Sequence, residues 1–156
     1  MIIISKAPRD SAEFISSACL EVYEILKRYI TVHDEIFSFS IRRLIPLPFI
    51  FKEIDFQTVY RDCRFREREL YEVIEQLPNK SFEASNLLMV LREYSSALLK
   101  TISKLKVISE KLWKKADKEI KYEKPEYKSD LEDYFSCVQK YQEIGRRLNL
   151  ILNLMR

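Results

Sequence analysis

Apolar residues recur every three or four positions along most of the chain, with polar residues between them. Over residues 10–40 the steps alternate between three and four, the heptad spacing of a helix that packs at a shallow angle on its neighbours. These positions are Ile15, Ala18, Val22, Ile25, Tyr29, Val32, Ile36 and Phe39. Asp10 and Glu13 have the spacing of a capping box just after Pro8, which predicts that the helix begins near residue 10.

The same spacing predicts three further helices. They are expected over residues 55–77, 81–122 and 129–155. Pro78 ends the second helix, in which Arg66 occupies a position where an apolar residue would fit. The third helix would have roughly forty residues and a length of about 60 Å, so it would extend beyond its partners. A Ser-Asp-Leu-Glu capping box opens the fourth helix.

Four helices with mostly short connections predict an all-α fold. The expected architecture is an antiparallel four-helix bundle with heptad-like packing, in a single domain over residues 1–156. Gly145 lies on the apolar seam of the fourth helix, where glycine costs about 1 kcal/mol relative to alanine. We therefore expect either a close backbone approach or a bulky opposing ring at this position.

The segment from Leu44 to Phe51 interrupts the heptads with apolar residues and two prolines. Prolines one residue apart exclude a regular helix and favour an extended backbone before each of them. One interpretation is a buried crossover between the first and second helices, strapped over one end of the bundle. The other is an exposed hydrophobic patch that binds a protein partner. The residues of such a patch would be Leu47, Phe49 and Phe51.

Composition excludes several classes of function. The 156 residues include one glycine, so there is no Gly-rich phosphate loop, dinucleotide-binding fingerprint or nucleophile elbow. Three widely separated cysteines and one histidine form no CxxC pair or zinc-ligand spacing, so we expect no metal ion, disulfide framework or cofactor. The chain has no signal peptide and no apolar run of membrane-spanning length, which predicts a cytoplasmic protein without a membrane partner.

The net charge of +3 is unevenly distributed, and the excess of lysine lies in the second half of the third helix. Lysines there recur along one side of the predicted helix, with an aromatic residue among them. This lysine ridge consists of Lys100, Lys104, Lys111, Lys114, Lys115, Lys118 and Lys121, with Trp113 nearby. It favours nonspecific nucleic-acid binding, because lysines displace counterions from phosphates and rings stack on bases. The alternative is a solvated helix face, stabilised by i, i+4 ion pairs such as Glu110–Lys114.

A second charged stretch lies on the second helix, where Arg61, Arg64 and Arg68 share one side at i, i+3 and i+7. Acidic residues surround them, and residues 53–78 carry 4 basic and 7 acidic side chains, a net charge of 4 − 7 = −3. Neighbouring carboxylates would compete with phosphate for these arginines. The pattern therefore favours an ion-pair network, between helices or between protomers, over nucleic-acid binding.

The single histidine stands five residues after an arginine, in the stretch Arg28-Tyr-Ile-Thr-Val-His33. This arrangement resembles the R-x4-H signature of the HEPN family of helical-bundle ribonucleases. The resemblance implies that His33 acts as the acid or base in RNA cleavage and that Arg28 binds the scissile phosphate. The alternative is that His33 is a packed structural side chain beside the heptad seam.

We expect a non-enzymatic module that acts through its helix surfaces, either self-associating or docking on a protein partner in a larger complex. Long heptad repeats, the proline segment and the lack of a convincing catalytic set favour this function. The alternatives are a nucleic-acid-binding protein that uses the lysine ridge and a ribonuclease of the HEPN type. No small-molecule substrate is evident from the sequence.

Overall fold

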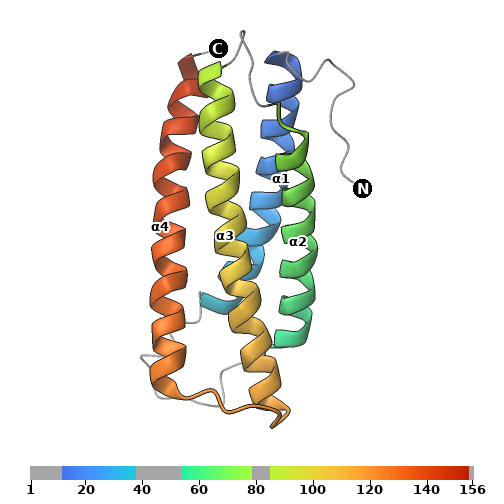
Figure 1. Cartoon of the computed structure of the whole chain (residues 1–156), viewed down its shortest axis with the longest axis vertical. Helices are drawn as coiled ribbons and strands as arrows, with labels where there is room; N and C mark the ends of the chain where they lie inside the picture. The colour runs from blue at the N-terminus through green and yellow to red at the C-terminus, as the bar shows by residue number, and fades with distance from the viewer. Residues whose placement is uncertain (1–11, 38–53, 79–84, 155–156) are drawn as a thin grey trace.

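The structure, a computed structural model, describes residues 12–37, 54–78 and 85–154 and confirms an all-α four-helix bundle (Figure 1). The helices are α1 (Ala12–Phe37), α2 (Phe56–Gln76), α3 (Ser85–Ala116) and α4 (Lys124–Leu154). The described residues contain no strand.

Two predicted features lie outside the described residues. One is the proline segment over 44–51, together with the hydrophobic patch that we expected on it. The other is the capping box that begins at Asp10. Both stay predictions from the sequence.

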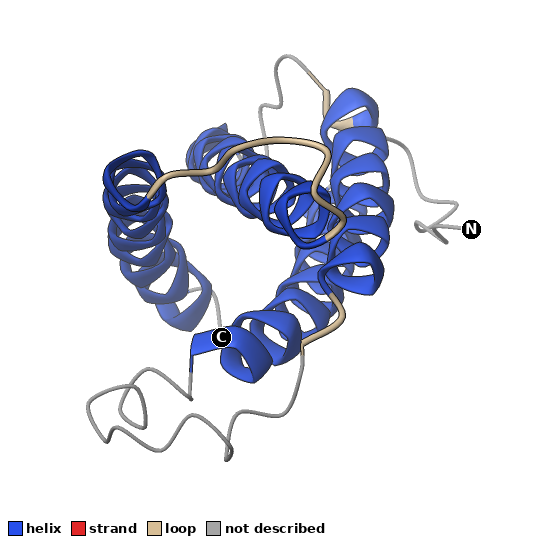
Figure 2. Cartoon of the chain, turned by 90° about the horizontal axis from the view of Figure 1, so that it is seen from below, coloured by secondary structure: helices blue, strands red, loops and turns tan. Residues whose placement is uncertain are grey.

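Consecutive helices run in opposite directions, so the bundle is antiparallel as predicted (Figure 1). Seen from one end, the helices follow the order α1, α2, α3, α4 around the bundle (Figure 2). The backbone of α3 closely approaches each of the other three helices. Between α1 and α4, by contrast, no two Cα atoms of the described residues lie within 8 Å of each other. The first and last helices therefore face each other across a wider spacing than the other neighbours do.

The predicted heptad positions form the core of the bundle. On α1 the positions from Ile15 to Ile36 are all buried, whereas Phe39 lies outside the described residues. The α3 seam contributes side chains such as Leu91 and Leu98, which have no exposed surface. Buried residues from all four helices join one continuous cluster. Removal of these apolar side chains from water is the main favourable contribution to folding. Their burial at the predicted positions confirms the heptad-like packing.

Asp55 caps the N-terminus of α2. Its carboxylate accepts hydrogen bonds from the backbone N–H groups of Gln57 and Thr58 at 3.1 and 3.2 Å, and from the Thr58 hydroxyl at 2.7 Å. The bonds from Thr58 lower the pKa of Asp55, and the cap satisfies two N–H groups that lack a helical partner. Because α2 ends at Gln76, the predicted bounds are within one residue of the observed ones.

The predicted end of the third helix is wrong. α3 stops at Ala116, six residues early, because Lys118 adopts a left-handed conformation with φ 60°. The N–H of Glu119 donates to the carbonyl of Lys114 at 2.9 Å, and the N–H of Lys118 donates to the carbonyl of Lys115 at 3.0 Å. These two bonds form the Schellman pattern that closes a helix C-terminus, here with lysine at the position that glycine usually occupies.

The predicted start of the fourth helix is also wrong, because α4 already begins at Lys124. Pro125 lies in the first turn, where its missing N–H removes no helical hydrogen bond. The N–H of Tyr127 donates to the carbonyl of Glu123 at 3.0 Å and thereby closes the first turn. The Ser-Asp-Leu-Glu box therefore lies inside the helix and does not cap it.

Gly145 on α4 faces a tyrosine ring on α3. A Cβ atom at this position would lie 3.1 Å from Cε2 of Tyr94, closer than ordinary van der Waals contact. The expectation of a bulky opposing ring is confirmed. Glycine here allows α4 to pack closely on α3 at the level of Tyr94.

Candidate functional site

An aromatic cluster joins α1 to α4 where the two backbones stay apart. Its members are Tyr29, His33 and Phe37 on α1 and Tyr134, Phe135 and Tyr141 on α4. Four-residue steps place the three α1 side chains on one side of their helix. The ring of Phe37 stacks on that of Tyr134 with centroids 5.5 Å apart, and the His33 ring lies 5.7 Å from the same ring. Side chains therefore bridge the spacing between the first and last helices.

The Tyr134 hydroxyl is the centre of the hydrogen bonds in the aromatic cluster. It bonds to the hydroxyl of Tyr29 and lies 2.6 Å from Nδ1 of His33. A neutral His33 with its proton on Nε2 accepts at Nδ1 from Tyr134, whose oxygen then accepts from the Tyr29 hydroxyl. In this assignment all three groups have a partner, although the side chains of Tyr29 and Tyr134 are completely or almost completely buried.

Burial also sets the charge state of the aromatic cluster. It raises the pKa of Tyr29 and of Tyr134 well above the usual range for tyrosine, and it lowers the pKa of His33. The neutral form of each group is therefore favoured at neutral pH. Neutral hydroxyls and a neutral imidazole form a hydrogen-bonded link between two helices. These contacts support the structural interpretation of His33.

Arg28 and His33 contact different neighbours of α1. The Arg28 guanidinium lies 3.6 Å from the Glu69 carboxylate on α2, whereas His33 bonds to Tyr134 on α4. Five positions along a helix rotate one side chain from the other by about 140° around the axis. The structure therefore does not bring the R-x4-H pair together at one site. The ribonuclease function stays a prediction from the sequence.

The burial of His33 predicts a pH dependence of stability. Burial lowers its folded-state pKa below the ordinary value of 6.5, against a smaller opposing effect of the Asp34 carboxylate. As the pH falls, the unfolded chain therefore binds a proton before the folded chain does. The stabilisation is complete above the ordinary pKa and is lost as the pH falls through the folded-state value, with a slope of at most about 1.4 kcal/mol per pH unit.

Urea unfolding between about pH 7.5 and pH 5 measures this effect against a His33→Gln variant. Subtracting the variant curve from the wild-type curve removes the contribution of carboxylates, which titrate in both proteins. The difference should decline with acidification. Parallel curves for the two proteins would contradict the predicted burial of a neutral His33.

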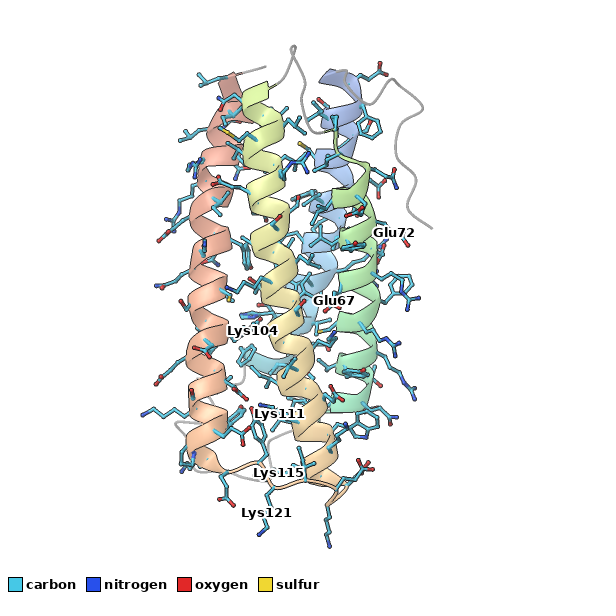
Figure 3. The ribbon with its side chains drawn as sticks, viewed as in Figure 1. Glu67, Glu72, Lys104, Lys111, Lys115 and Lys121 are labelled. Atoms are coloured by element: carbon cyan, nitrogen blue, oxygen red, sulfur yellow. The ribbon has the colours of Figure 1, made fainter. Side chains whose placement is uncertain are left out.

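Acids on α4 and α3 partly neutralise the lysine ridge. The Lys111 ammonium donates hydrogen bonds to Asp130 at 2.9 Å and to Glu126 at 3.0 Å, and these bonds raise its pKa. Figure 3 shows Lys111 between α3 and α4. Lys114 forms the expected i, i+4 pair with Glu110 at 2.9 Å. Lys111 therefore joins α3 to α4, whereas Lys114 is paired within α3, and both lysines are less available to phosphates.

The lysine ridge also does not continue along one helix. Lys118 and Lys121 lie in the 117–123 connection beyond the end of α3, which corrects their expected place on a helix face. Figure 3 shows Lys121 at the end of the bundle. A shallow hollow of about 730 Å³ lies there, lined mostly by charged side chains. Its charged residues are Lys115, Lys118, Glu119, Lys121, Glu123 and Lys124.

The remaining members of the ridge differ in exposure. Trp113 is half-buried and packs against Tyr60 of α2 with ring centroids 5.8 Å apart, so one side of its ring is already in contact. Lys104 is also half-buried, and Lys100 is exposed. The structure therefore divides the ridge into paired, half-buried and exposed side chains.

Arg61, Arg64 and Arg68 are exposed, and no salt bridge joins any of them to another residue in the described ranges. An acid that was expected to pair with them turns toward α3 instead, because Glu67 accepts from Lys106 at 2.9 Å. Figure 3 shows Glu67 between α2 and α3. The expected ion-pair network between helices therefore does not include these three arginines, and the alternative between protomers stays open.

An ion-pair network forms around Arg66 instead. Its guanidinium bonds to Glu69 and lies 3.4 Å from Asp62 on the same helix, and Arg28 of α1 also contacts Glu69. The side chains of Arg66 and Glu69 are only 16% and 12% exposed. The sequence signal for this network was a charged residue at a seam position of α2.

The described residues offer no metal centre, and burial makes two of the cysteines less reactive. No group of three or more His, Cys, Asp or Glu side chains in residues 12–37, 54–78 and 85–154 is arranged to hold a metal ion. Burial raises the pKa of Cys63 to about 12 and that of Cys19 to about 11. Both shifts disfavour the thiolate that nucleophilic chemistry requires.

No protein-family model matches the chain, and comparisons with curated proteins and with solved structures found no match. Across the helices that the structure describes, none is both long and apolar enough to cross a membrane.

Proposed function

We propose that the chain is a non-enzymatic interaction module that binds a protein partner through the outer face of α2. This face consists of the exposed residues of the helix between positions 61 and 75. They are Arg61, Arg64, Phe65, Arg68, Tyr71, Glu72 and Glu75. α2 lies at the periphery of the bundle (Figure 2), so a partner can approach this side without displacing another helix.

The observation that supports this function is the combination of free arginines with half-exposed rings. Phe65 is 49% exposed and lies between Arg64 and Arg68, and Tyr71 is 55% exposed and follows Arg68 by three positions. No salt bridge in the described ranges involves Arg61, Arg64 or Arg68. Arginine and aromatic residues concentrate in protein interfaces. A ring buries a large apolar area, and a guanidinium binds a carboxylate through two hydrogen bonds. An arginine already paired within the chain would add less to such a contact.

Site-specific photo-crosslinking in the native cell tests this function. A photoreactive amino acid in place of Tyr71 is expected to form an adduct with a defined protein, identified by mass spectrometry. The same probe in place of Gln139, an exposed residue of α4, should form none. Adding Arg64→Glu and Arg68→Glu should remove the adduct of the first probe. No adduct from the α2 position, or equal adducts from both positions, would overturn the proposal.

Nucleic-acid binding is a second candidate function, favoured by the lysines around the hollow at the end of the bundle. If this function is correct, a fluorescently labelled single-stranded RNA binds with an affinity that falls steeply between about 50 and 200 mM salt. Lys115→Glu combined with Lys121→Glu should abolish this binding, as measured by fluorescence anisotropy. An affinity that does not change with salt, or that is the same in the double variant, would count against nucleic-acid binding.

A further inference from the structure

The charges on the outer face of α2 are separated along the helix. Arg61 and Arg64 lie in its N-terminal part, Glu72 and Glu75 lie in its C-terminal part, and Arg68 lies between them. All five side chains are exposed, and no salt bridge within the described ranges involves any of them. The face therefore presents a basic half and an acidic half on the same side of the bundle.

The order of residues on this face is symmetric about Arg68. The members of each pair stand at equal numbers of residues before and after it: Arg61 with Glu75, Arg64 with Glu72, and Phe65 with Tyr71. Because a helix rises and turns by a constant amount per residue, these pairs are also symmetric in space about the direction in which Arg68 points. A half-turn about that direction reverses the helix and exchanges the positions of its basic and acidic halves and of its two rings.

We infer that two copies of the chain pair through these faces with their α2 helices antiparallel. The two-fold axis then lies between the two helices, at the level of Arg68 and perpendicular to the direction in which Arg68 points. The inference rests on the proposed function and names its partner, a second copy of this chain. Arg61 then lies at the level of Glu75 of the partner subunit, and Arg64 lies at the level of Glu72 of the partner subunit, so each basic half meets an acidic half. The two-fold symmetry repeats each contact, as in other isologous dimers.

The rings supply the apolar part of the same contact. The two Phe65 rings line one edge of the contact and the two Tyr71 rings line the other, which removes four half-exposed rings from water. This burial matters because exposed ion pairs alone contribute little to affinity. Arg68 of each subunit points toward the axis, and Glu72 stands one turn further along the same helix, where it offsets the charge of the two central arginines.

Charge complementarity selects this partner and this orientation. Parallel α2 helices would place arginine opposite arginine and glutamate opposite glutamate, which is unfavourable. An acidic partner or a phosphate backbone would match Arg61 and Arg64 but would meet Glu72 and Glu75 in the other half. A second copy of the chain in antiparallel orientation matches both halves.

The test exchanges the charges of the two halves. Arg61→Glu with Arg64→Glu makes both halves acidic, and Glu72→Arg with Glu75→Arg makes both basic. In sedimentation experiments each double variant alone is expected to dimerise at least about tenfold more weakly than the wild type. An equimolar mixture of the two should form a heterodimer, and a variant with all four substitutions should form a homodimer again. In both of these cases opposite charges meet once more.

Two controls accompany the charge exchange. Circular dichroism establishes that every variant keeps the helical content of the wild type. Lys128→Glu with Arg146→Glu makes the same change in net charge as Arg61→Glu with Arg64→Glu, but at two exposed positions of α4. This matched variant is expected to dimerise like the wild type.

A wild type that stays monomeric at about 1 mM would overturn the pairing. In that case, a crosslink from the Tyr71 position to a different protein would still support the proposed function. The absence of any crosslink would overturn both the pairing and the proposed function. A dimer that tolerates both charge exchanges would place the interface elsewhere. A mixture that fails to pair, when the wild type does pair, would overturn the antiparallel arrangement.

Discussion

Replacing Glu69 with alanine is expected to destabilise the bundle by about 2 kcal/mol, because it leaves a largely buried arginine, 16% exposed, without its main partner. Glu69 lies between Arg66 on its own helix and Arg28 on α1. In the variant, the more distant Asp62 at 3.4 Å is the acidic partner that Arg66 keeps, and its Nε atom already lacks a hydrogen-bond partner. A guanidinium that is removed from water and poorly paired costs several times more than an exposed one.

Urea unfolding followed by circular dichroism measures this loss. Replacing both partners, with Arg66→Met and Glu69→Leu, should recover most of it, since an apolar pair of similar volume is often as stable as a buried ion pair. Glu132→Ala on α4 removes an exposed glutamate and should cost less than about 0.5 kcal/mol. Equal losses for Glu69→Ala and Glu132→Ala would contradict the role given to Glu69.

Tyr134→Phe is expected to cost about 2 kcal/mol, although it removes a single oxygen atom. The hydroxyl of Tyr134 is the shared partner of Tyr29 and His33, and the Tyr134 side chain has no exposed surface. Without it, a buried hydroxyl and an imidazole nitrogen lose their partner together. The aromatic cluster would also lose its polar link between α1 and α4.

A double-mutant cycle tests whether the hydroxyls act together. Tyr29→Phe should cost less in the Tyr134→Phe background than in the wild type, because its partner has already gone. Tyr94→Phe makes the same change on a buried ring of α3 outside this hydrogen-bonded group and should cost less than about 1 kcal/mol. Additive losses at Tyr29 and Tyr134 would show that the hydroxyls are not coupled.

The heptad spacing was sufficient to predict the four helices and their buried faces, because burial of apolar side chains dominates the packing of a bundle. It did not predict the connection between α3 and α4. A Schellman motif is usually recognised in a sequence by a glycine at the left-handed position. Here Lys118 adopts that conformation instead. The Ser-Asp-Leu-Glu box at Ser129 led to a wrong start for the fourth helix for a related reason. Serine and glutamate three residues apart also occur on the exposed side of a helix interior. A helix can begin just before a proline, as α4 does at Lys124 before Pro125.

The ion-pair network around Arg66 could be predicted from the sequence, but only by working out which residues of α2 lie on which side of the helix. The seam through Cys63 and Leu70 fixes which residues flank the core, and it places Glu67 and Glu69 at its two edges. The arginines at 61, 64 and 68 fall on the opposite side, so Glu67 and Glu69 point away from them although they are close in sequence. The aromatic cluster was not accessible in this way. It depends on which residues of α1 and α4 stand at the same level, and this alignment is set by tertiary packing.

The wide spacing between α1 and α4 has a consequence for local unfolding. The described part of α1 is joined to α4 through side chains alone, whereas the backbone of α3 packs closely along both α2 and α4. Elements with less backbone packing open at lower free energy, so the amide hydrogens of α1 should exchange with deuterium before those of α3. Helices α2, α3 and α4 then form the cooperative unit that opens last. The outer face of α2 belongs to that unit and stays in place while the first helix detaches and returns.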